Sequence, residues 1–240
     1  MNINRENNLL NKNIVYDLTP FTHLDFPDHL ACIVWLAGCD LRCDYCYNKD
    51  IVFAKNGKMT FNDVLNFLNT RQNLLDGVVI SGGEATLHNL ILFCQEIKSK
   101  GFKIKLDTNG INFQHIKELV DLKLIDYIAL DYKAPKYKFN TITHATVNKF
   151  DTFEQTLNYL IKSNFNFEIR TTVHADLLDE KDINTILNDL KDKKYKGNYF
   201  LQNYLDTQDN IGDIKNSTKK FDLEKIQDNN DKIKIQFRNY

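Results

Sequence analysis

The chain has 240 residues, of which 42% are hydrophobic and 26% charged, a composition sufficient for one ordinary globular core. Its formal net charge of −1 at pH 7 excludes a general electrostatic attraction to nucleic acid or to an anionic membrane surface. No apolar run reaches membrane-spanning length, the first residues show no signal-peptide core, and the five cysteines do not suggest a disulfide framework, so we expect a cytoplasmic protein.

The N-terminal part of the chain leads into a predicted strand. Residues 1–14 are polar and rich in asparagine, which predicts a loosely ordered extension. Residues 15–27 contain two prolines and no sustained hydrophobic period, and we expect them to pack beside the first strand as an ordered lead-in. Residues 31–36 form that strand, because the run is short and apolar and holds β-branched and aromatic side chains.

Three cysteines follow this strand directly, at Cys39, Cys43 and Cys46, in the spacing C-x₃-C-x₂-C. Since a loop that leaves a strand end can direct several side chains at one point, these thiols suit an iron–sulfur cluster. With three cysteine ligands, a four-iron cube would keep one iron free to bind something else. A zinc site normally closes with four ligands, and no second cysteine pair is present, but a zinc or electron-transfer module remains an alternative.

Short apolar runs and segments with helical spacing alternate through the rest of the chain. The further predicted strands cover residues 77–80, 102–106, 127–130, 167–174 and 198–204. The predicted helices cover residues 61–68, 87–97, 116–124, 153–161 and 183–190, and Thr60 caps the first. Since alternating strands and helices form right-handed parallel units, the pattern predicts an α/β fold, a partial (β/α)6 TIM-like barrel of parallel strands over residues 15–205.

Residues 206–240 form a predicted C-terminal extension. They begin with a polar stretch, and a short helix is expected at 221–227. The alternating pattern at 233–237 is typical of a half-buried strand. We expect this extension to close or cap the barrel.

Polar side chains follow three of the predicted strands at the point where each strand ends. They form the segments Ser81-Gly82-Gly83-Glu84, Asp107-Thr108-Asn109-Gly110 and Asp131-Tyr132-Lys133. Because chemistry in parallel α/β folds sits at the carboxyl ends of the strands, we expect these segments and the cysteine loop to face one mouth. The structural alternatives are a tight turn with a solvated Glu84, an Asx turn at Asp107, and an ordinary ion pair between Asp131 and Lys133.

The cysteine spacing, the Gly-Gly-Glu segment and the Asp-x-Lys segment together resemble the radical S-adenosylmethionine (SAM) enzymes, over residues 15–204. Residues 20–27 and 35–39 resemble the activases of glycyl radical enzymes, most closely the type that activates anaerobic ribonucleoside-triphosphate reductase. Residues 107–110 and 130–133 also resemble the activating enzyme of pyruvate formate-lyase. The chain departs from the family pattern at Ala85, where proline is usual, at Tyr47, where many activases have histidine, and at Asp28, where glycine is common.

The resemblance implies that Cys39, Cys43 and Cys46 hold a [4Fe–4S] cluster whose free iron binds SAM. The residues it assigns to SAM or its surroundings are Tyr45, Ser81, Gly82, Gly83, Glu84, Asp107, Thr108, Asn109, Asp131, Lys133 and Arg170. Glycine lets the backbone approach the methionine end of SAM, and Arg170 needs a partner because it lies inside an apolar strand. Asp107 and Thr108 are further expected to hold a monovalent cation near the SAM carboxylate, whereas His174 is a weaker candidate.

The activity that the resemblance implies is reductive cleavage of SAM to generate a glycyl radical on anaerobic ribonucleoside-triphosphate reductase. A reduced flavodoxin or ferredoxin would then be the electron donor. Two other activities remain open. One is activation of another glycyl radical enzyme, such as pyruvate formate-lyase, and the other is a small-molecule radical SAM reaction such as 7-carboxy-7-deazaguanine synthesis.

Overall fold

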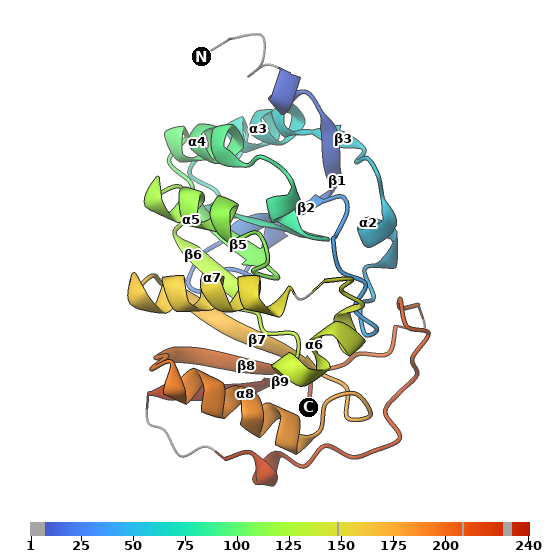
Figure 1. The fold of residues 1–240 in the computed structure, drawn as a ribbon. Coiled ribbons are helices and arrows are strands. Elements are labelled where there is room, and N and C mark those ends of the chain that lie inside the picture. The colour runs from blue at the N-terminus through green and yellow to red at the C-terminus, as the bar shows by residue number, and fades with distance from the viewer. Residues whose placement is uncertain (1–7, 148, 208, 228–231) are drawn as a thin grey trace. The chain divides into compact units, whose positions relative to one another are not determined.

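The computed structural model describes residues 8–147, 149–207, 209–227 and 232–240. The chain folds as two compact units, whose helices and strands are labelled in Figure 1. The first unit contains the chain up to Asp40 together with Asp50–Thr108 and Asn112–Ile128. The second unit contains Leu41–Lys49, Asn109–Ile111 and Ala129–Tyr240. Residues 1–7 of the predicted N-terminal extension lie outside the described residues.

The first unit contains five complete strands. They are β1 (Asn13–Thr22), β2 (Ala31–Leu36), β3 (Met59–Thr60), β4 (Gly77–Gly82) and β5 (Lys103–Thr108). Their order is β3-β1-β2-β4-β5, with β1 antiparallel to β2 and β3, and with β4 parallel to both β2 and β5. The parallel pairs join three of the strands that the sequence predicts.

The lead-in packs beside the first predicted strand, as expected, but most of it is a strand itself. β1 pairs with β2 from Val15 opposite Leu36 to Thr22 opposite Ala31, with two register shifts along the way. Sequence patterns missed this strand because Pro20 interrupts it. The proline is tolerated because β3 pairs only with Asn13 and Val15, so the backbone around residue 20 needs no partner on that side.

Helices α3 (Phe61–Asn69), α4 (Ile91–Ser99) and α5 (Phe113–Asp121) also belong to the first unit, as do the 3₁₀ turn η1 (Ala85–Leu87) and all of α2 (Lys49–Phe53) except its first residue. The predicted cap of α3 is confirmed. The Thr60 side chain accepts a hydrogen bond from the Asp63 amide, and the Asp63 side chain accepts one from the Thr60 amide. This reciprocal pair satisfies two backbone donors and defines where α3 begins.

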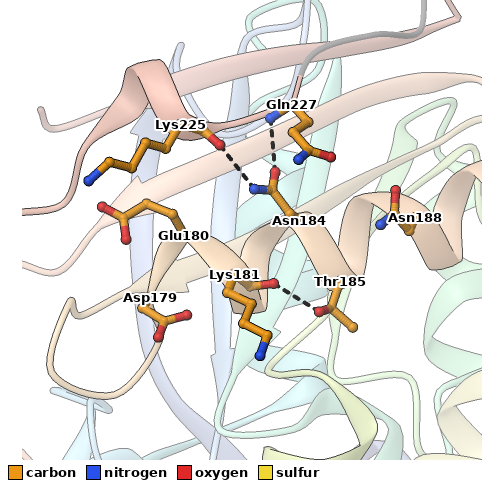
Figure 2. A pocket seen from close by; sticks show the side chains of 8 residues that line it. All are labelled: Asp179, Glu180, Lys181, Asn184, Thr185, Asn188, Lys225 and Gln227. Atoms are coloured by element: carbon orange, nitrogen blue, oxygen red, sulfur yellow. Dashed lines mark hydrogen bonds between the residues drawn. The ribbon is translucent and has the colours of Figure 1, made fainter.

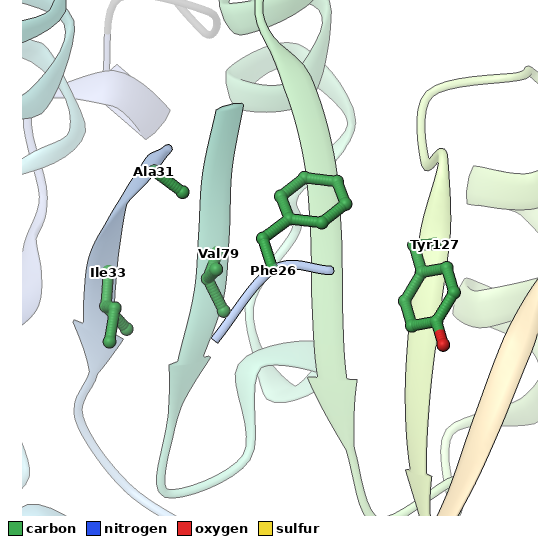
Figure 3. Packing of buried hydrophobic residues seen from close by; sticks show 5 residues of the cluster. All are labelled: Phe26, Ala31, Ile33, Val79 and Tyr127. Carbon is green, nitrogen blue, oxygen red and sulfur yellow. The ribbon is translucent and has the colours of Figure 1, made fainter. Parts of the chain in front are cut away.

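A hydrophobic cluster in the first unit anchors the end of the lead-in. Figure 3 shows its five members, Phe26, Ala31, Ile33, Val79 and Tyr127, all of them buried. A Cβ atom at Gly77 would lie 2.8 Å from the Phe26 ring, so the first residue of β4 has to be glycine for this ring to fit. The ring therefore holds the lead-in against the strands that precede the predicted site segments.

The second unit contains the last three residues of β6 (Tyr127–Asp131) and the strands β7 (Phe167–Val173), β8 (Gly197–Asn203) and β9 (Ile233–Arg238). β8 pairs in parallel with both β7 and β9, so the strand expected at 233–237 is confirmed. The helices are α6 (Lys136–Thr143), α7 (Phe150–Lys162) and α8 (Glu180–Asp192). At residues 221–227 only a 3₁₀ turn is present, η2 (Leu223–Lys225), in place of the expected short helix.

The segment between β8 and β9 is fastened to α8 and to the loop before it by side chains that bind its backbone. The Asn184 side chain donates to the Lys225 carbonyl and accepts from the Gln227 amide, at 2.9 Å each, as Figure 2 shows. Glu180 accepts from the Asp222 amide, and Asp176 accepts from the amides of Thr218 and Lys219. Residues 218–227 of the predicted extension are therefore bonded to one helix and the loop before it.

All six strands of the predicted α/β repeat are present, as β2, β4, β5, β6, β7 and β8. The α/β class with a mostly parallel sheet is therefore confirmed. Within the described parts of the chain, no helix combines the length and the apolar character needed to span a membrane.

Candidate functional site

The Gly82-Gly83 turn at the end of β4 is packed backbone against backbone in the first unit. A Cβ atom at Gly83 would lie 2.0 Å from the Gly38 carbonyl oxygen and 3.2 Å from the Cys39 Cβ atom. Gly82 has φ of +125°, and a Cβ atom there would lie 2.3 Å from the Leu36 backbone. Only glycine fits at either position, and the turn lies directly beside the start of the cysteine motif.

Glu84 follows this turn and is buried, with 2% of its surface exposed. Its Oε1 atom accepts hydrogen bonds from the Thr86 amide at 3.0 Å, the Thr86 hydroxyl at 2.6 Å and the Thr108 hydroxyl at 2.8 Å. The alternative of a solvated Glu84 is therefore wrong. The carboxylate is held in one orientation by neighbours on η1 and at the end of β5, as a group that binds a cationic ligand needs to be.

Asp107, at the end of β5, is bonded to two other side chains of the first unit. The ammonium group of Lys105 lies 2.5 Å from Asp107 Oδ1, and the Ser81 hydroxyl donates to Asp107 Oδ2 at 3.3 Å. Lys105 was not among the predicted site residues. A sequence signal for it was present, since a lysine between two apolar residues of a buried strand needs a partner, and residues two apart in a strand face the same way.

The cysteine loop of the second unit carries Cys43, Tyr45 and Cys46 and is held on two sides. The amides of Arg42 and Asp44 donate to the carbonyls of Thr143 and Ile142 at the end of α6, at 2.9 and 3.1 Å. On the other side, the carbonyls of Cys46 and Asp44 accept from the amides of Ile211 and Gly212, at 3.0 and 2.9 Å. A further bond of 2.9 Å from the Cys46 amide to the Cys43 carbonyl closes a turn between the two cysteines.

Asp131, Lys133 and Arg170 form a largely buried ion network in the second unit. Asp131 lies 2.9 Å from the Lys133 ammonium group and 3.0 Å from Arg170 Nε. Burial alone would raise the pKa of Asp131, but Arg170 and Lys133 outweigh it and lower this pKa to about 2. Arg170 thus has the partner that its position in an apolar strand requires. The ion pair between Asp131 and Lys133, which was the structural alternative to a role in SAM binding, is present, and that role stays a prediction.

Cys43 and Tyr45 lie within electrostatic reach of this network: burial has the largest effect on the pKa of each, Lys133 lowers it and Asp131 raises it. Burial raises the pKa of Cys43 to about 12, so a thiolate there needs a strong positive charge close to the sulfur. Burial likewise raises the pKa of Tyr45. The Tyr45 hydroxyl is buried and faces the Cys43 thiol, with which its geometry falls short of a regular hydrogen bond, so it remains available to a bound ligand.

The remaining predicted residues have identifiable structural contacts. Asn109 is buried, and its side-chain oxygen accepts from the Ile111 amide at 2.9 Å, closing an Asx turn. His174 Nε2 contacts the Lys215 carbonyl at 2.7 Å, so this histidine holds the segment after β8. Sequence reasoning also missed His144, which lies 2.6 Å from Asp44 in the cysteine loop.

The residues predicted to act together fall into two groups. The first unit brings together Cys39, the Ser81–Glu84 segment, Asp107 and Thr108, whereas the second brings together Cys43, Tyr45, Cys46, Asp131, Lys133 and Arg170. All five cysteines are free thiols. Across the described ranges, no three His, Cys, Asp or Glu side chains are arranged as a metal-ion site, so the cluster ligands stay a prediction from residue type and spacing.

A hollow of about 570 Å³ lies elsewhere in the second unit, between α8 and the segment that carries Lys225 and Gln227. Figure 2 shows the polar residues that line it, among them Glu180, Asn184 and Lys225. None of them is a predicted site residue. The hollow is formed where the segment after β8 crosses the helix.

The sequence is similar to several activating enzymes. It is 32% identical over 186 residues to the candidate glycyl-radical enzyme activating enzyme MJ1227 of Methanocaldococcus jannaschii, covering 75% of this chain and 77% of that protein. It is 30% identical over 134 residues to the pyruvate formate-lyase-activating enzyme of Streptococcus mutans, covering half of each chain. The chain therefore spans only half of the length of the streptococcal enzyme.

The fold is similar to those of two solved structures. The structure of anSMEcpe with bound AdoMet matches 71% of this chain and 50% of its own, with a TM-score of 0.58 and 22% identity. The structure of Streptococcus suis SuiB matches 84% of this chain and 47% of its own, with a TM-score of 0.62 and 18% identity. These likenesses support the predicted α/β fold of the partial-barrel type. Residues 33–220 match the model of the Radical SAM superfamily, whose members use a [4Fe–4S] cluster and SAM, and the chain belongs to this superfamily.

Proposed function

We propose that this protein is an activase that generates a glycyl radical on anaerobic ribonucleoside-triphosphate reductase. The observation that carries the proposal is the Gly82-Gly83-Glu84 turn, packed against Gly38 at the start of the cysteine motif with its carboxylate fixed. Among relatives, MJ1227 carries a name in the activase class and aligns over most of both chains, which favours an activase over a small-molecule reaction.

The three cysteines of the motif are the proposed ligands of a [4Fe–4S] cluster. They are free thiols, which are the preferred ligands of iron–sulfur clusters, and Cys43 and Cys46 share one turn. Burial raises the pKa of Cys43 to about 12 in spite of the nearby Lys133, and the iron of a bound cluster would stabilise its thiolate. A bound cluster supplies the electron for reductive cleavage of SAM, which is the difficult chemistry of the reaction.

The remaining residues are proposed to bind and orient SAM. Glu84 would accept from the amino group, while Gly82 and Gly83 give the backbone access to the methionine part of the molecule. Tyr45 has a buried hydroxyl beside the Cys43 thiol that would be available to the ligand. Further proposed contacts come from Ser81, Thr108, Asn109, Asp131, Lys133 and Arg170.

The proposed partners are a glycyl radical enzyme as substrate and a reduced flavodoxin or ferredoxin as electron donor. The preference for anaerobic ribonucleotide reductase comes from residues 20–27 and 35–39, which resemble its activases. The free cysteines suit a reducing cytoplasm. The streptococcal pyruvate formate-lyase-activating enzyme, similar over half of its length, makes pyruvate formate-lyase the second partner to test.

The experiment is anaerobic reconstitution with iron and sulfide, followed by EPR of the reduced protein with and without SAM. We expect a four-iron signal that changes on SAM addition, and then a glycyl doublet on anaerobic ribonucleotide reductase but not on pyruvate formate-lyase. Cys39→Ala, Cys43→Ala and Cys46→Ala should each abolish SAM cleavage, whereas Cys94→Ala, the control at a buried helical thiol, should retain it. A cluster signal indifferent to SAM would refute the activase, and a doublet only on pyruvate formate-lyase would reassign the partner.

A further inference from the structure

We infer that Lys105 provides, from within the chain, the positive charge that the resemblance assigns to a monovalent cation at Asp107. The protein would then bind SAM without potassium or sodium at this position. The inference rests on the proposed function as far as SAM is concerned. The contact between Lys105 and Asp107 is independent of it.

The geometry at Asp107 is that of a completed ion pair. The Lys105 ammonium group lies 2.5 Å from Asp107 Oδ1, and the Ser81 hydroxyl donates to Oδ2. Only 2% of the Lys105 side chain and 14% of the Asp107 side chain are exposed to solvent. A pair so shielded from water interacts more strongly than an exposed one and is little screened by salt.

Strand β5 fixes the position of this ammonium group. Lys105 and Asp107 are two residues apart, so both side chains leave the strand on the same face. Lys105 is flanked by the buried residues Ile104 and Leu106, and its backbone lies opposite Val79 in the parallel pairing with β4. The charge is therefore held covalently and cannot exchange with the solution.

The two predicted cation ligands are both engaged in other contacts. Asp107 is bonded to the ammonium group of Lys105, and the Thr108 hydroxyl is directed at Glu84, 2.8 Å away. A potassium or sodium ion bound to Asp107 would also lie within a few ångströms of a like charge, which is costly in a shielded site. The residues present therefore do not fit a separate monovalent cation, and Lys105 takes its place.

The test compares wild-type protein with Lys105→Met, which keeps the length of the side chain and removes its charge. SAM binding by the reconstituted proteins is measured by calorimetry in chloride salts of potassium, sodium and N-methylglucamine at equal ionic strength. Wild-type affinity should be the same in all three within about twofold. The variant should lose about tenfold in N-methylglucamine and recover in potassium, because a small cation can then occupy the vacated position.

A second readout needs neither cluster nor SAM. Binding of thallium(I), a probe for potassium sites, is measured by equilibrium dialysis on the apoprotein. Wild type should bind none at this position, Lys105→Met should bind one ion per chain, and the double variant Lys105→Met/Asp107→Asn should bind none. Lys103→Met removes an exposed lysine from the same strand and is the matched control, for which we expect wild-type behaviour.

Potassium-dependent SAM binding by wild type, or thallium binding by wild type that Asp107→Asn removes, would overturn the inference. So would a Lys105→Met variant that is folded and indifferent to cations in both assays. If Lys105→Met does not fold, the wild-type measurements still decide whether Asp107 holds an exchangeable cation. Failure of wild type and of every variant to bind SAM, with the thallium pattern intact, would count against the proposed function and leave the Lys105 assignment standing.

Discussion

The backbone carbonyl of Cys46 accepts a hydrogen bond from the Ile211 amide at 3.0 Å, which joins the cysteine loop to the segment after β8. The next amide, of Gly212, donates to the Asp44 carbonyl at 2.9 Å. On the other side of the loop, the amides of Arg42 and Asp44 donate to backbone carbonyls at the end of α6. The loop that carries two of the proposed cluster ligands is thus held by two elements of its own unit that lie more than 90 residues further along the sequence.

Gly212→Ala should loosen this loop. A Cβ atom at residue 212 would lie 2.7 Å from Asp44 Cβ and 2.8 Å from Asp44 Oδ1, closer than such atoms approach, so the segment has to move away from the loop. We expect faster hydrogen exchange in residues 41–49 of the apoprotein and a lower iron content after reconstitution. Mass spectrometry of peptides and iron analysis measure the two effects.

Asp209→Ala is the control for this variant. It removes an exposed ion pair with Lys49 between the same two segments, and an exposed pair contributes at most about 1 kcal/mol. Its exchange and iron content should match those of wild type. Equal exchange in Gly212→Ala and wild type would mean that residues 211 and 212 do not hold the loop.

Gly83→Ala should disrupt the turn beside Cys39. The added Cβ atom would lie 2.0 Å from the Gly38 carbonyl oxygen, a backbone atom that cannot rotate away, and would break the 2.8 Å bond from the Glu84 amide to that oxygen. We expect loss of SAM-dependent change in the EPR signal and a loss of about 2 kcal/mol or more in stability.

Gly101→Ala is the control that separates the loss of stability from the loss of the SAM response. Gly101 has φ of +88° and open space around its Cβ position, so alanine there introduces strain of about 1 kcal/mol without a clash. This variant should be somewhat less stable than wild type but should respond to SAM normally. A Gly83→Ala protein that responds to SAM as wild type does would remove the Gly82-Gly83 turn from the proposed site.

Glu84→Gln tests whether the fixed carboxylate binds the SAM amino group. The amide oxygen of glutamine can still accept from Thr86 and Thr108, so the protein should fold, but the negative charge is lost. Since a hydrogen bond to a charged group contributes about 1.5–3 kcal/mol, SAM affinity should fall about tenfold or more. Calorimetry on the reconstituted protein measures this, with Glu118→Gln, at a half-exposed side chain of α5, as control. Unchanged affinity would exclude Glu84 as a ligand of SAM.

Asp182→Asn should make the stability of the protein less dependent on pH under acidic conditions. Burial would raise the pKa of Asp182, but hydrogen bonds from Lys138 and Tyr137, 2.6 Å each, and from the Asp179 amide outweigh it and lower this pKa below its ordinary value of 3.8. A carboxyl group with a lowered folded-state pKa contributes stability above the unfolded-state value, and this is lost as the pH falls through the folded-state value.

Urea denaturation at a series of pH values measures this contribution. Wild type should lose stability more steeply than Asp182→Asn below about pH 4, and at pH 7 the variant should be less stable by about 2 kcal/mol. Asp151→Asn is the control. It removes an exposed ion pair with Lys136, which lies on α6 as Lys138 does, and it should leave the pH profile unchanged. Parallel stability profiles for wild type and Asp182→Asn would show that the charge of Asp182 contributes no net stability.

The regular elements were largely predictable, because short apolar strands and amphipathic helices have distinct periods. The six strands of the α/β repeat and the Thr60 cap of α3 are examples. Strand β1 was not predicted as a strand, since Pro20 and its register shifts destroy the alternating pattern, and its pairing with β2 is a tertiary contact. Helix α6 was missed because its hydrophobic face is short, with Phe139 and Ile142 as its buried apolar residues.

By itself the sequence determined the family and the types of residue at each strand end, because cysteine spacing, Gly-Gly-Glu and Asp-x-Lys are local patterns that need no folded partner to be read. Only the tertiary structure decided which charges meet. It paired Arg170 with Asp131 and Lys138 with Asp182, and it bonded Cys46 to Ile211. The physical reason is that electrostatic and hydrogen-bond energies depend on distance and burial, which the order of residues along a chain does not contain.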